Sequence, residues 1–394
     1  MANPTQKKVA DVFNQLADAI ETGDFGAKAT IGLTILDSEH GPEELVKGAE
    51  SAKEKYDNLD IVLIGNGVET DLELVEASDL EEAHEKMNNM LESDKLDGAV
   101  TLHYSFPLGV STVGRVKTPG IGKEMYLATT TGTSATQRVA SMIKNAVYGL
   151  ATAKAMGDDN PSLGILNIEG ARLVEQKLSE LDENGYNINF AQSARADGGV
   201  VMRGNDLLKG TPDIMVTDTL TGNMLMKMFS AFTTGGGYEA SGFGYGPGVG
   251  EDYDKLICII SRASGAPVVA NAIKYAAMAS QGDLKSKISA EMEKARKAGL
   301  NDILDEVEST QSSNETEEEV EAPAKKTTGE EIPGLDILTI EDAKKVLWKE
   351  DIYAETGMGC TGPVILVAEE DEEKAREILI ENEYISENGS GGTC

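Results

Sequence analysis

Residues 213–250 read DIMVTDTLTGNMLMKMFSAFTTGGGYEASGFGYGPGVG and predict a strand, a turn and a helix in succession. An apolar run at 214–216 precedes a polar turn, and the helix that follows has an apolar face made of Leu220, Met224 and Met228. In open α/β sheets, ligands bind in the crevice beyond the carboxyl ends of the strands. The stretch therefore predicts an α/β fold with a ligand site where this strand meets its helix.

Eight glycines crowd the second part of this stretch, between residues 235 and 250. Glycine adopts positive φ at little cost and leaves the backbone N–H groups uncovered, so a loop of this composition can wrap an anion. Asn223 and Lys227, one helical turn apart, add an amide and a positive charge. A plain surface loop and a solvated helix edge fit the same residues, so the pattern alone leaves both interpretations open.

The chain carries a formal net charge of −33 over its 394 residues, with 68 acidic against 35 basic side chains. Nucleic acid and anionic membrane surfaces would repel such a chain, so we expect neither as a partner. No apolar run is long enough to span a membrane, and the first 20 residues lack the apolar core of a signal peptide. These features favour a cytoplasmic protein without a membrane span.

The three cysteines are too few and too scattered for a disulfide framework, and they suit a reducing compartment. The three histidines are equally scattered, so we expect neither a metal site nor a bound cofactor. Cys258 lies in an apolar run and should be an inert buried thiol. Cys394 ends a glycine-rich tail, where we expect no role in chemistry.

Cys360 stands in the segment GMGCTGP (357–363), directly before an apolar run. The flanking glycines expose the sulfur, and successive backbone N–H groups in such a turn can lower the thiol pKa and stabilise an oxyanion. No histidine lies nearby in the sequence to activate the thiol. The residues alone leave open whether Cys360 is a nucleophile or a bystander.

Predicted strands and helices alternate along the first 307 residues. We expect strands at 61–64, 98–102, 125–128, 163–167, 187–190 and 256–261, and helices at 43–55, 79–94, 173–181 and 266–279. A strand, a crossover helix and a strand within 29–64 make a βαβ unit, whose strands are parallel. Residues 103–115 are expected to be a loop. We therefore predict an α/β domain with a multi-stranded, mostly parallel sheet and helices on both faces.

Two further helix starts fit an anion as well as a plain cap. His40, Gly41 and Pro42 open one predicted helix, where free N–H groups attract anions, but Pro42 equally suits an ordinary first turn. The segment TTTGTSATQR (129–138) opens another, with hydroxyls that bind a substrate or simply cap the helix. Neither segment can be assigned on these residues alone.

The composition divides the chain into four parts. Residues 1–25 form a predicted amphipathic N-terminal helix, and residues 26–307 form the α/β domain. The segment 308–331 contains eight acidic residues and no aromatic group, so we expect a flexible acidic linker. Residues 332–394 form a small C-terminal appendage that carries Cys360.

Several segments together resemble the acyl carrier protein:phosphate acyltransferases of phospholipid synthesis. They are HGPEELVKGA (40–49), TPGIGKEMY (118–126), LGILNIEG (163–170), GNDLLKGTPDIMVTDTLTGNMLMK (204–227) and the region 261–273. This resemblance implies a fold similar to phosphotransacetylase and the isocitrate dehydrogenases. It also implies transfer of an acyl group from a thioester to inorganic phosphate, which would be the anion bound here. The segments 102–107 and 260–264 depart from the pattern of that family, as do the linker and the appendage.

Over nearly its full length, including the MGCTGP motif around Cys360, the chain resembles the family of component C alpha subunits of glycine, sarcosine and betaine reductase complexes. This resemblance implies that an acetyl group arrives from the carboxymethyl selenoether of selenoprotein A. It implies that a cysteine holds the acetyl group as a thioester, a role that Cys360 fits, and that inorganic phosphate releases it as acetyl phosphate. A beta subunit similar to ketoacyl synthase III is the implied partner.

On these resemblances we expect seven residues to bind phosphate or the acyl group: Asn205, Asp218, Thr221, Asn223, Lys227, Ser261 and Arg262. Lys227 and Arg262 would neutralise phosphate, while loop amides would meet the developing oxyanion. Two alternatives stay open. One is a free-standing acyltransferase that uses coenzyme A or acyl carrier protein, with Cys360 incidental. The other is a non-catalytic scaffold subunit that has kept an enzyme fold.

Overall fold

A computed structural model describes residues 28–195, 198–313, 322–335, 339–359, 362–382 and 384–385. The predicted N-terminal helix at 1–25, Cys360 and Cys394 lie outside the described residues. None of the described helices combines the length and the apolar character needed to cross a membrane.

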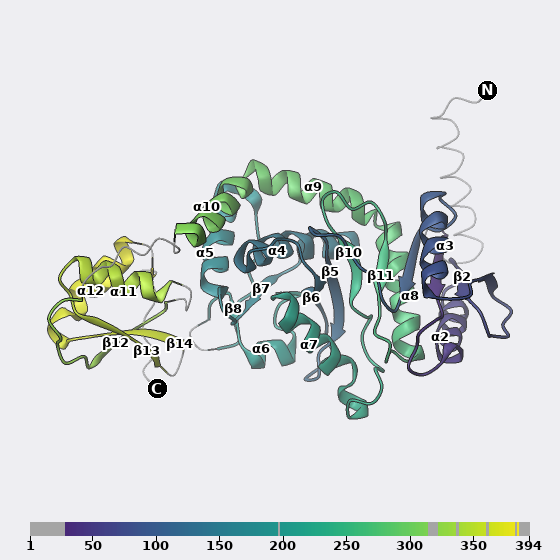
Figure 1. The fold of residues 1–394 in the computed structure, drawn as a ribbon, viewed down its shortest axis with the longest axis horizontal. Coiled ribbons are helices and arrows are strands. Elements are labelled where there is room, and N and C mark those ends of the chain that lie inside the picture. The colour runs from purple at the N-terminus through teal and green to yellow at the C-terminus, as the bar shows by residue number, and fades with distance from the viewer. Residues whose placement is uncertain are drawn as a thin grey trace, which may run out of the picture.

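Eleven strands form one sheet in the order β3-β2-β1-β4-β11-β10-β5-β6-β9-β7-β8 (Figure 1). The strands are β1 (Ala29–Thr34), β2 (Leu59–Gly65), β3 (Glu73–Glu76), β4 (Gly98–Thr101), β5 (Ser111–Lys117), β6 (Glu124–Gly132), β7 (Leu163–Leu166), β8 (Val201–Met202), β9 (Ile214–Val216), β10 (Gly246–Val249) and β11 (Ile257–Ile259). Seven of their ten pairings are parallel. The predicted many-stranded, mostly parallel α/β sheet is therefore confirmed.

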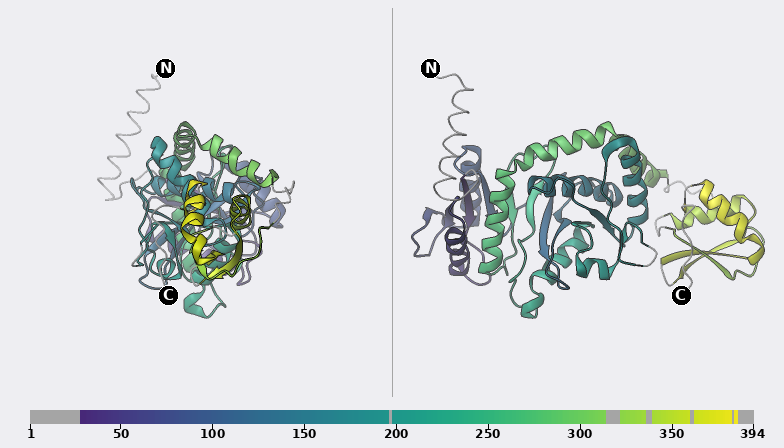
Figure 2. Two further views of the ribbon diagram at one scale, coloured as in Figure 1. Left: turned by 90° about the vertical axis from the view of Figure 1, so that its left-hand side faces the viewer. Right: turned by 180° about the vertical axis from the view of Figure 1, so that it is seen from behind.

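Helices cover both faces of the sheet (Figures 1 and 2). They are α2 (Pro42–Lys55), α3 (Leu80–Glu92), α4 (Arg138–Ala155), α5 (Ala171–Leu181), α6 (Gly204–Lys209), α7 (Thr219–Ser230), α8 (Ala266–Gln281), α9 (Leu284–Lys297) and α10 (Leu300–Ser313). Alternate residues of β6 show the two faces, because side chains along a strand point in opposite directions. Tyr126 and Ala128 pack into a core with α4, whereas Met125 and Leu127 pack into a second core with Met226 of α7.

The strands reverse direction in the middle of the sheet. β10 is antiparallel to both of its neighbours, β11 and β5, and β5 is antiparallel to β6. As a result, β1, β2, β3, β4 and β11 point one way, and β6, β7, β8 and β9 point the other. The carboxyl ends of the two halves therefore lie at opposite edges of the sheet. Residues that follow strands of different halves can meet only through a segment that crosses the sheet.

The predicted loop at 103–115 was wrong in its second part, because Ser111–Lys117 form the central strand β5. Polar side chains in this segment hide the strand from a hydrophobicity pattern. Inside the sheet these side chains find partners, as Thr112 Oγ1 lies 2.7 Å from Thr130 Oγ1 on β6.

The glycine-rich segment ends in the buried strand β10 and is not one open loop. A Cβ on Gly246 would lie 1.8 Å from the carbonyl oxygen of Val113. Glycine is thus required at this position by the close approach of two strands, and anion binding does not explain it. The predicted strand at 187–190 is reduced to one bridge between Phe190 and Leu163.

Residues 330–381 form a smaller body with its own hydrophobic core. Its antiparallel sheet has the order β12-β14-β13, with β12 (Glu330–Pro333), β13 (Ala354–Gly359) and β14 (Gly362–Val367), and α11 (Ile340–Lys349) and α12 (Glu372–Glu381) pack against it. β13 ends just before Cys360, and Gly359 is paired with Gly362. In Figures 1 and 2 this body lies beyond α10. The four-part division of the chain stays a prediction.

Candidate functional site

Helix α7 lies across β6 and β5, and its first turn is fixed to the sheet. The Asp218 carboxylate caps the helix, because it accepts hydrogen bonds from the backbone N–H and the hydroxyl of Thr221, both at 2.9 Å. A Cβ on Gly222 would lie 1.7 Å from a carbonyl oxygen of β6, so glycine permits this close packing. Asn223 donates its side-chain N–H to the carbonyl oxygen of Thr130 at 3.1 Å.

The loop after β11 folds on itself through two serines. The backbone N–H of Ser261 donates to Ser264 Oγ at 3.1 Å, and the N–H of Ala263 donates to Ser261 Oγ at 3.2 Å. Ser264 is fully buried and donates its hydroxyl to the Glu239 carboxylate at 3.0 Å. These bonds fix the position of Ser261 Oγ at the carboxyl end of the strand.

Lys227, Ser261 and Glu239 meet near the end of α7. The Lys227 Nζ donates to Ser261 Oγ at 3.3 Å and lies 3.9 Å from Glu239 Oε1. The Glu239 side chain is 4% exposed, whereas that of Lys227 is 57% exposed. An ammonium group has three N–H donors, and neither contact is short. Lys227 can therefore bind an anion that arrives from solvent.

Arg262 follows Ser261 and faces the loop after β1. Its Nε lies 3.2 Å from Asp37 Oδ2 and its Nη2 lies 3.3 Å from Asp37 Oδ1, with both side chains about half exposed. Glu39 donates its backbone N–H to the Arg262 carbonyl oxygen at 2.9 Å, and His40 Nε2 lies 3.2 Å from the Ala263 carbonyl oxygen. The ends of β1 and β11 thus share one polar cluster. Phosphate can compete for the exposed guanidinium, because a surface ion pair contributes little.

Tyr238 connects the glycine-rich segment to α2 beside this cluster. Its phenol donates to Glu44, which also accepts the backbone N–H of Ala266 at 2.9 Å. Burial and the bond to Glu44 raise the pKa of Tyr238 to about 12, so the phenol stays protonated at neutral pH. The ring of His40 packs at 5.2 Å from that of Tyr238, measured between centroids. Tyr238 therefore holds two segments together and is not suited to proton transfer.

The structure brings together three of the seven predicted site residues: Lys227, Ser261 and Arg262. The first two are in contact, and the third is the neighbour of Ser261 in the chain. They meet because α7 runs from the carboxyl edge of one half of the sheet to the carboxyl edge of the other. Helix α7 therefore connects the two carboxyl edges, which the strands cannot do because those of the two halves end at opposite edges of the sheet.

The other four predicted residues lie elsewhere. Asp218 and Thr221 cap the first turn of α7, and Asp218 is about 14 Å along the helix axis from Lys227. Asn223 is turned towards β6, and Asn205 is exposed on α6, which follows the outermost strand β8. The structure thus places Asp218, Thr221 and Asn205 at the opposite carboxyl edge and Asn223 between the two edges, one helical turn before Lys227. The predicted contact of all four residues with phosphate stays a prediction.

Sequence reasoning did not select Glu239 or Asp37. A signal for Glu239 exists, because it is the single acidic residue between positions 219 and 250. Asp37 lies three residues after the end of β1 and has a φ of 69°, a conformation that aspartate tolerates better than most residues. Its pairing with Arg262 depends on a contact across 225 positions of sequence, which no local pattern reveals.

Thr129 and Thr130, the first two residues of the threonine-rich segment 129–138, are buried inside the sheet. Thr129 Oγ1 donates to the carbonyl oxygen of Thr112, and Thr130 Oγ1 donates to that of Tyr245, both at 2.7 Å. The hydroxyls of these two buried threonines hold β6 to its neighbours. They are therefore structural and do not form an open anion loop.

No group of three or more metal-ligating side chains occurs among the described residues. Burial raises the pKa of the Cys258 thiol far above its usual range, so this cysteine stays protonated inside β11. The cysteine with the greater predicted role, Cys360, lies outside the part of the chain that the structure describes.

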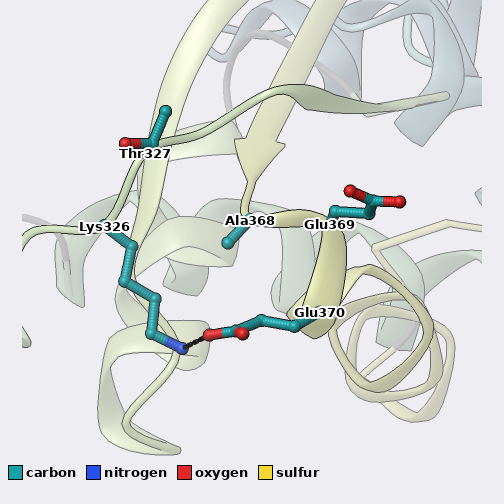
Figure 3. Close-up of a pocket in the computed structure, with 5 residues that line it drawn as sticks. All are labelled: Lys326, Thr327, Ala368, Glu369 and Glu370. Atoms are coloured by element: carbon teal, nitrogen blue, oxygen red, sulfur yellow. Dashed lines mark hydrogen bonds and ion pairs between the residues drawn. The ribbon is translucent and has the colours of Figure 1, made fainter.

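A groove of about 580 Å³ lies between residues 326–327, which precede β12, and the segment after β14, and is lined by Lys326, Thr327, Ala368, Glu369 and Glu370 (Figure 3). Lys326 Nζ reaches Glu370 Oε1 at 2.9 Å and Asp371 Oδ2 at 2.6 Å. The two carboxylates raise the pKa of Lys326 and neutralise its charge. We therefore do not assign this groove to phosphate.

Comparison with known proteins finds a match to the family model described as fatty acid synthesis protein over residues 29–366. The chain is 57% identical over 374 residues to the "Glycine/sarcosine/betaine reductase complex component C subunit alpha" of Peptoclostridium acidaminophilum, which covers 95% of this chain and 97% of that protein. It is 25% identical over 234 residues to the "Phosphate acyltransferase" of Anoxybacillus flavithermus, which covers 50% of this chain and 70% of that one. Among solved structures, a branched-chain phosphotransacylase from Enterococcus faecalis is similar with a TM-score of 0.47 and 16% identity, and the match covers 64% of this chain and 99% of that one.

Proposed function

This chain belongs to the fatty acid synthesis protein family, among the component C alpha subunits of glycine/sarcosine/betaine reductase complexes, and on that premise we propose that it transfers an acyl group from a thioester to phosphate. The phosphate acyltransferases among its relatives support the reaction class. A phosphate oxygen attacks the thioester carbonyl carbon, the carbon–sulfur bond breaks, and the thiolate leaves and takes up a proton. The product is an acyl phosphate.

The observation that carries the proposal is the Lys227–Ser261 contact with Arg262 beside it. Phosphate is repelled by a chain of net charge −33, so a site for it needs local positive charge. Lys227 is exposed and loosely held, and Arg262 presents a planar set of donors that matches phosphate oxygens. Ser261 adds a hydroxyl at a fixed position 3.3 Å from Lys227 Nζ.

In this site Lys227 and Arg262 hold the attacking phosphate and reduce its repulsion from the thioester. Donors that face the carbonyl oxygen stabilise the negative charge that develops on it, an effect worth about 3–4 kcal/mol for a single well-placed donor. Asp218, Thr221 and Asn205 are proposed to act at the opposite edge, on the acyl or carrier side of the substrate, and Asn223 between the two edges.

At finer detail, we propose that the acyl group is acetyl and that Cys360 carries it as a thioester. The acetyl group would derive from the carboxymethyl selenoether of selenoprotein A. A beta subunit similar to ketoacyl synthase III would be the partner, and the cytoplasm the setting. Of the predicted linker 308–331, the residues up to Ser313 belong to α10 and those from Glu330 belong to β12. The acidic segment between them would let the appendage present Cys360 to the phosphate site, because a tethered carrier raises local concentration without tight binding.

Intact-protein mass spectrometry after incubation with acetyl phosphate tests this proposal. We expect an acetyl adduct that maps to Cys360, is removed by hydroxylamine and is absent in Cys360→Ala. If arsenate-driven breakdown of acetyl phosphate in the presence of coenzyme A persists in Cys360→Ala and is lost in Lys227→Ala, the acetyl group is carried by free coenzyme A and Cys360 is incidental. Absence of both adduct and arsenolysis in the intact chain would overturn the proposed chemistry.

A further inference from the structure

The Lys227 side chain brings an amine to the place where an acyl phosphate would form. Its Nζ lies 3.3 Å from Ser261 Oγ, beside Arg262, and the side chain is 57% exposed. An acyl phosphate is an activated acyl donor, and a lysine amine is one of the nucleophiles that take up acyl groups in proteins. The product of the proposed reaction therefore has its carbonyl carbon within reach of a nucleophile of the protein itself.

Lys227 differs from other exposed lysines in how its nitrogen is held. The Nζ atoms of Lys28, Lys294 and Lys297 lie 2.6, 2.7 and 2.6 Å from a carboxylate oxygen. At Lys227 the distance from Nζ to Glu239 Oε1 is 3.9 Å. A lysine in a close ion pair must break that pair before its nitrogen can reach another molecule. Lys227 has no such pair to break, and its flexible four-carbon stem lets the nitrogen move towards a bound ligand.

The neighbouring polar groups are poorer acyl acceptors. The Arg262 guanidinium stays protonated and has no lone pair to offer. His40 Nε2 is bonded at 3.2 Å to the carbonyl oxygen of Ala263. The Tyr238 phenol donates to Glu44 and stays protonated, as described above. The amine of Lys227 is therefore the nitrogen best placed to react.

We propose that Lys227 is a self-modification site, whose Nζ takes the acyl group from an acyl phosphate bound at Ser261 and Arg262 and keeps it as an amide. This inference rests on the acyl transfer proposed above, because that reaction makes acyl phosphate at this site. It adds a covalent form of the protein to that reaction.

The step needs no reactant besides the acyl phosphate. The Lys227 ammonium first loses a proton to water, and the neutral nitrogen attacks the carbonyl carbon. The bond from that carbon to the bridging oxygen breaks, phosphate leaves with the electron pair, and the nitrogen gives up a second proton. The products are an acylated lysine and inorganic phosphate. Binding by Arg262 favours attack at Lys227, because a held reactant is presented at a high effective concentration.

The modification would switch off the site that carries it. An amide has no charge, so acylation removes the positive charge of Lys227. The Glu239 carboxylate, which is 4% exposed, stays beside the modified side chain, and the chain keeps its strongly negative net charge. Phosphate then meets Arg262 alone. Acyl phosphate that accumulates would thus slow its own formation.

Peptide mapping of the full chain after incubation with acetyl phosphate tests the proposal. Lys287 on α9 is the matched reference, because it is exposed and forms no ion pair within the described ranges. We expect acetylation of Lys227 to be at least about 10-fold faster than that of Lys287. N-hydroxysuccinimidyl acetate, which carries no phosphate, should acetylate the two lysines at rates within a factor of three. Hydroxylamine treatment before digestion removes thioesters and esters, on Cys360 or Ser261, and leaves the amide.

Two controls show whether phosphate recognition causes the preference. Excess inorganic phosphate should lower acetylation of Lys227 to the level of Lys287 and leave Lys287 unchanged. Arg262→Ala should reduce the preference in the same way. Equal acetylation of the two lysines by acetyl phosphate, or a preference for Lys227 that persists in excess phosphate, would overturn the proposal.

The same digest separates this proposal from the acyl transfer on which it rests. Selective acetylation of Lys227 without a Cys360 adduct and without arsenolysis would support the modification and contradict the proposed function. A Cys360 adduct and arsenolysis without selective acetylation of Lys227 would overturn the modification alone.

Discussion

Two buried glutamates face lysines in this protein, and they are built differently. Glu291 on α9 is held by Lys154 and Lys294, both at 2.7 Å, and accepts a third bond from the Tyr186 phenol at 3.2 Å. Glu239 accepts one close bond, from Ser264, and its other oxygen is 3.9 Å from Lys227. Both carboxylates are almost completely buried.

The difference shows how a functional lysine is recognised. At Glu291 the two lysines use their charge on the carboxylate, and the cluster connects α4, α9 and the turn at Tyr186. A cavity of about 340 Å³ lies beside that cluster, yet its lysines are already paired. At Glu239 the carboxylate keeps Lys227 in place without a close ion pair. The loosely held lysine, and not the presence of a cavity, indicates the anion site.

Lys227→Ala should give the largest effect and thereby test the functional side of this comparison. Loss of the exposed ammonium should reduce acyl transfer to phosphate by roughly 10²–10³-fold, because a single donor to the reacting anion is worth that much. The measurement is arsenolysis of acetyl phosphate by the full chain. Lys154→Ala is the control, since it should leave turnover per folded molecule within a factor of two. Equal losses of turnover in Lys227→Ala and Lys154→Ala would contradict the distinction between a functional and a structural lysine.

Glu291→Ala should test the structural side. It leaves Lys154 and Lys294 without their carboxylate, and we expect the free energy of unfolding to fall by about 2–4 kcal/mol. Removing one partner of a buried ion pair costs about 3–5 kcal/mol, and we expect somewhat less here because Lys294 reaches solvent. Urea unfolding measures this change. Glu239→Gln should cost less, because the amide oxygen still accepts from Ser264, and should instead alter the KM for phosphate. A larger destabilisation in Glu239→Gln would contradict the comparison.

The pH dependence of stability should follow Glu291. Burial raises the pKa of its carboxyl group, but the bonds and charges of Lys154 and Lys294 outweigh burial and lower the pKa below its usual value of 4.5. A carboxyl group with a lowered pKa in the folded state stabilises the fold above its unfolded pKa, and this stabilisation is lost as pH falls through the folded pKa. The gap in urea midpoint between the native chain and Glu291→Gln should thus be full at pH 7 and shrink below pH 4.5. A gap that widens in acid would contradict this assignment.

Asp218→Ala should have a smaller effect on stability. It removes the N-cap of α7, at a cost of about 1 kcal/mol. Asp218→Asn keeps an oxygen that accepts from Thr221 and should restore most of the stability. Thermal unfolding measures both. If Asp218→Asn is stable but loses acyl transfer, the carboxylate acts on substrate as well as on the helix.

Asn205→Ala should have the smallest effect. The side chain is exposed on α6, and surface substitutions of this kind change the free energy of unfolding by less than about 0.5 kcal/mol. We expect turnover at saturating acyl donor to stay within a factor of two and the KM for the acyl donor to rise, because Asn205 is proposed to act on that side of the substrate. An unchanged KM would contradict the proposed role of Asn205.

The local elements of the fold were predictable, because they depend on neighbouring residues. The β9–α7 unit follows from an apolar run, a polar turn and helical spacing, and Lys227 was noticed in that pattern, whereas Ser261 was selected on the family resemblance. The helical period also predicted that Leu220, Met224 and Met228 share a face. It could not tell that this face points outwards, because a period fixes which residues are neighbours and not which side packs on the sheet.

The long-range parts were not predictable. The reversal of strand direction depends on β10, whose glycines have no hydrophobic pattern and whose partner is β5, far away in sequence. That reversal separates Asp218 and Thr221 from Ser261 and Arg262. Glu239 joins the site through a bridge to Ser264, which no spacing along the chain indicates.

The place of β11 in the sheet also determines when the protein can fold during its synthesis. β4 pairs with β11 through Ala99 and Ile257, so the strands of the first hundred residues keep an open edge until residue 257 has left the ribosome. Helix α8, which packs on α2, arrives later still. An unpaired strand edge is a site for wrong pairing between chains. A nascent chain therefore carries such an edge from residue 101, where β4 ends, to residue 257, which is about 40% of its 394 residues, and chaperone binding is expected in that interval.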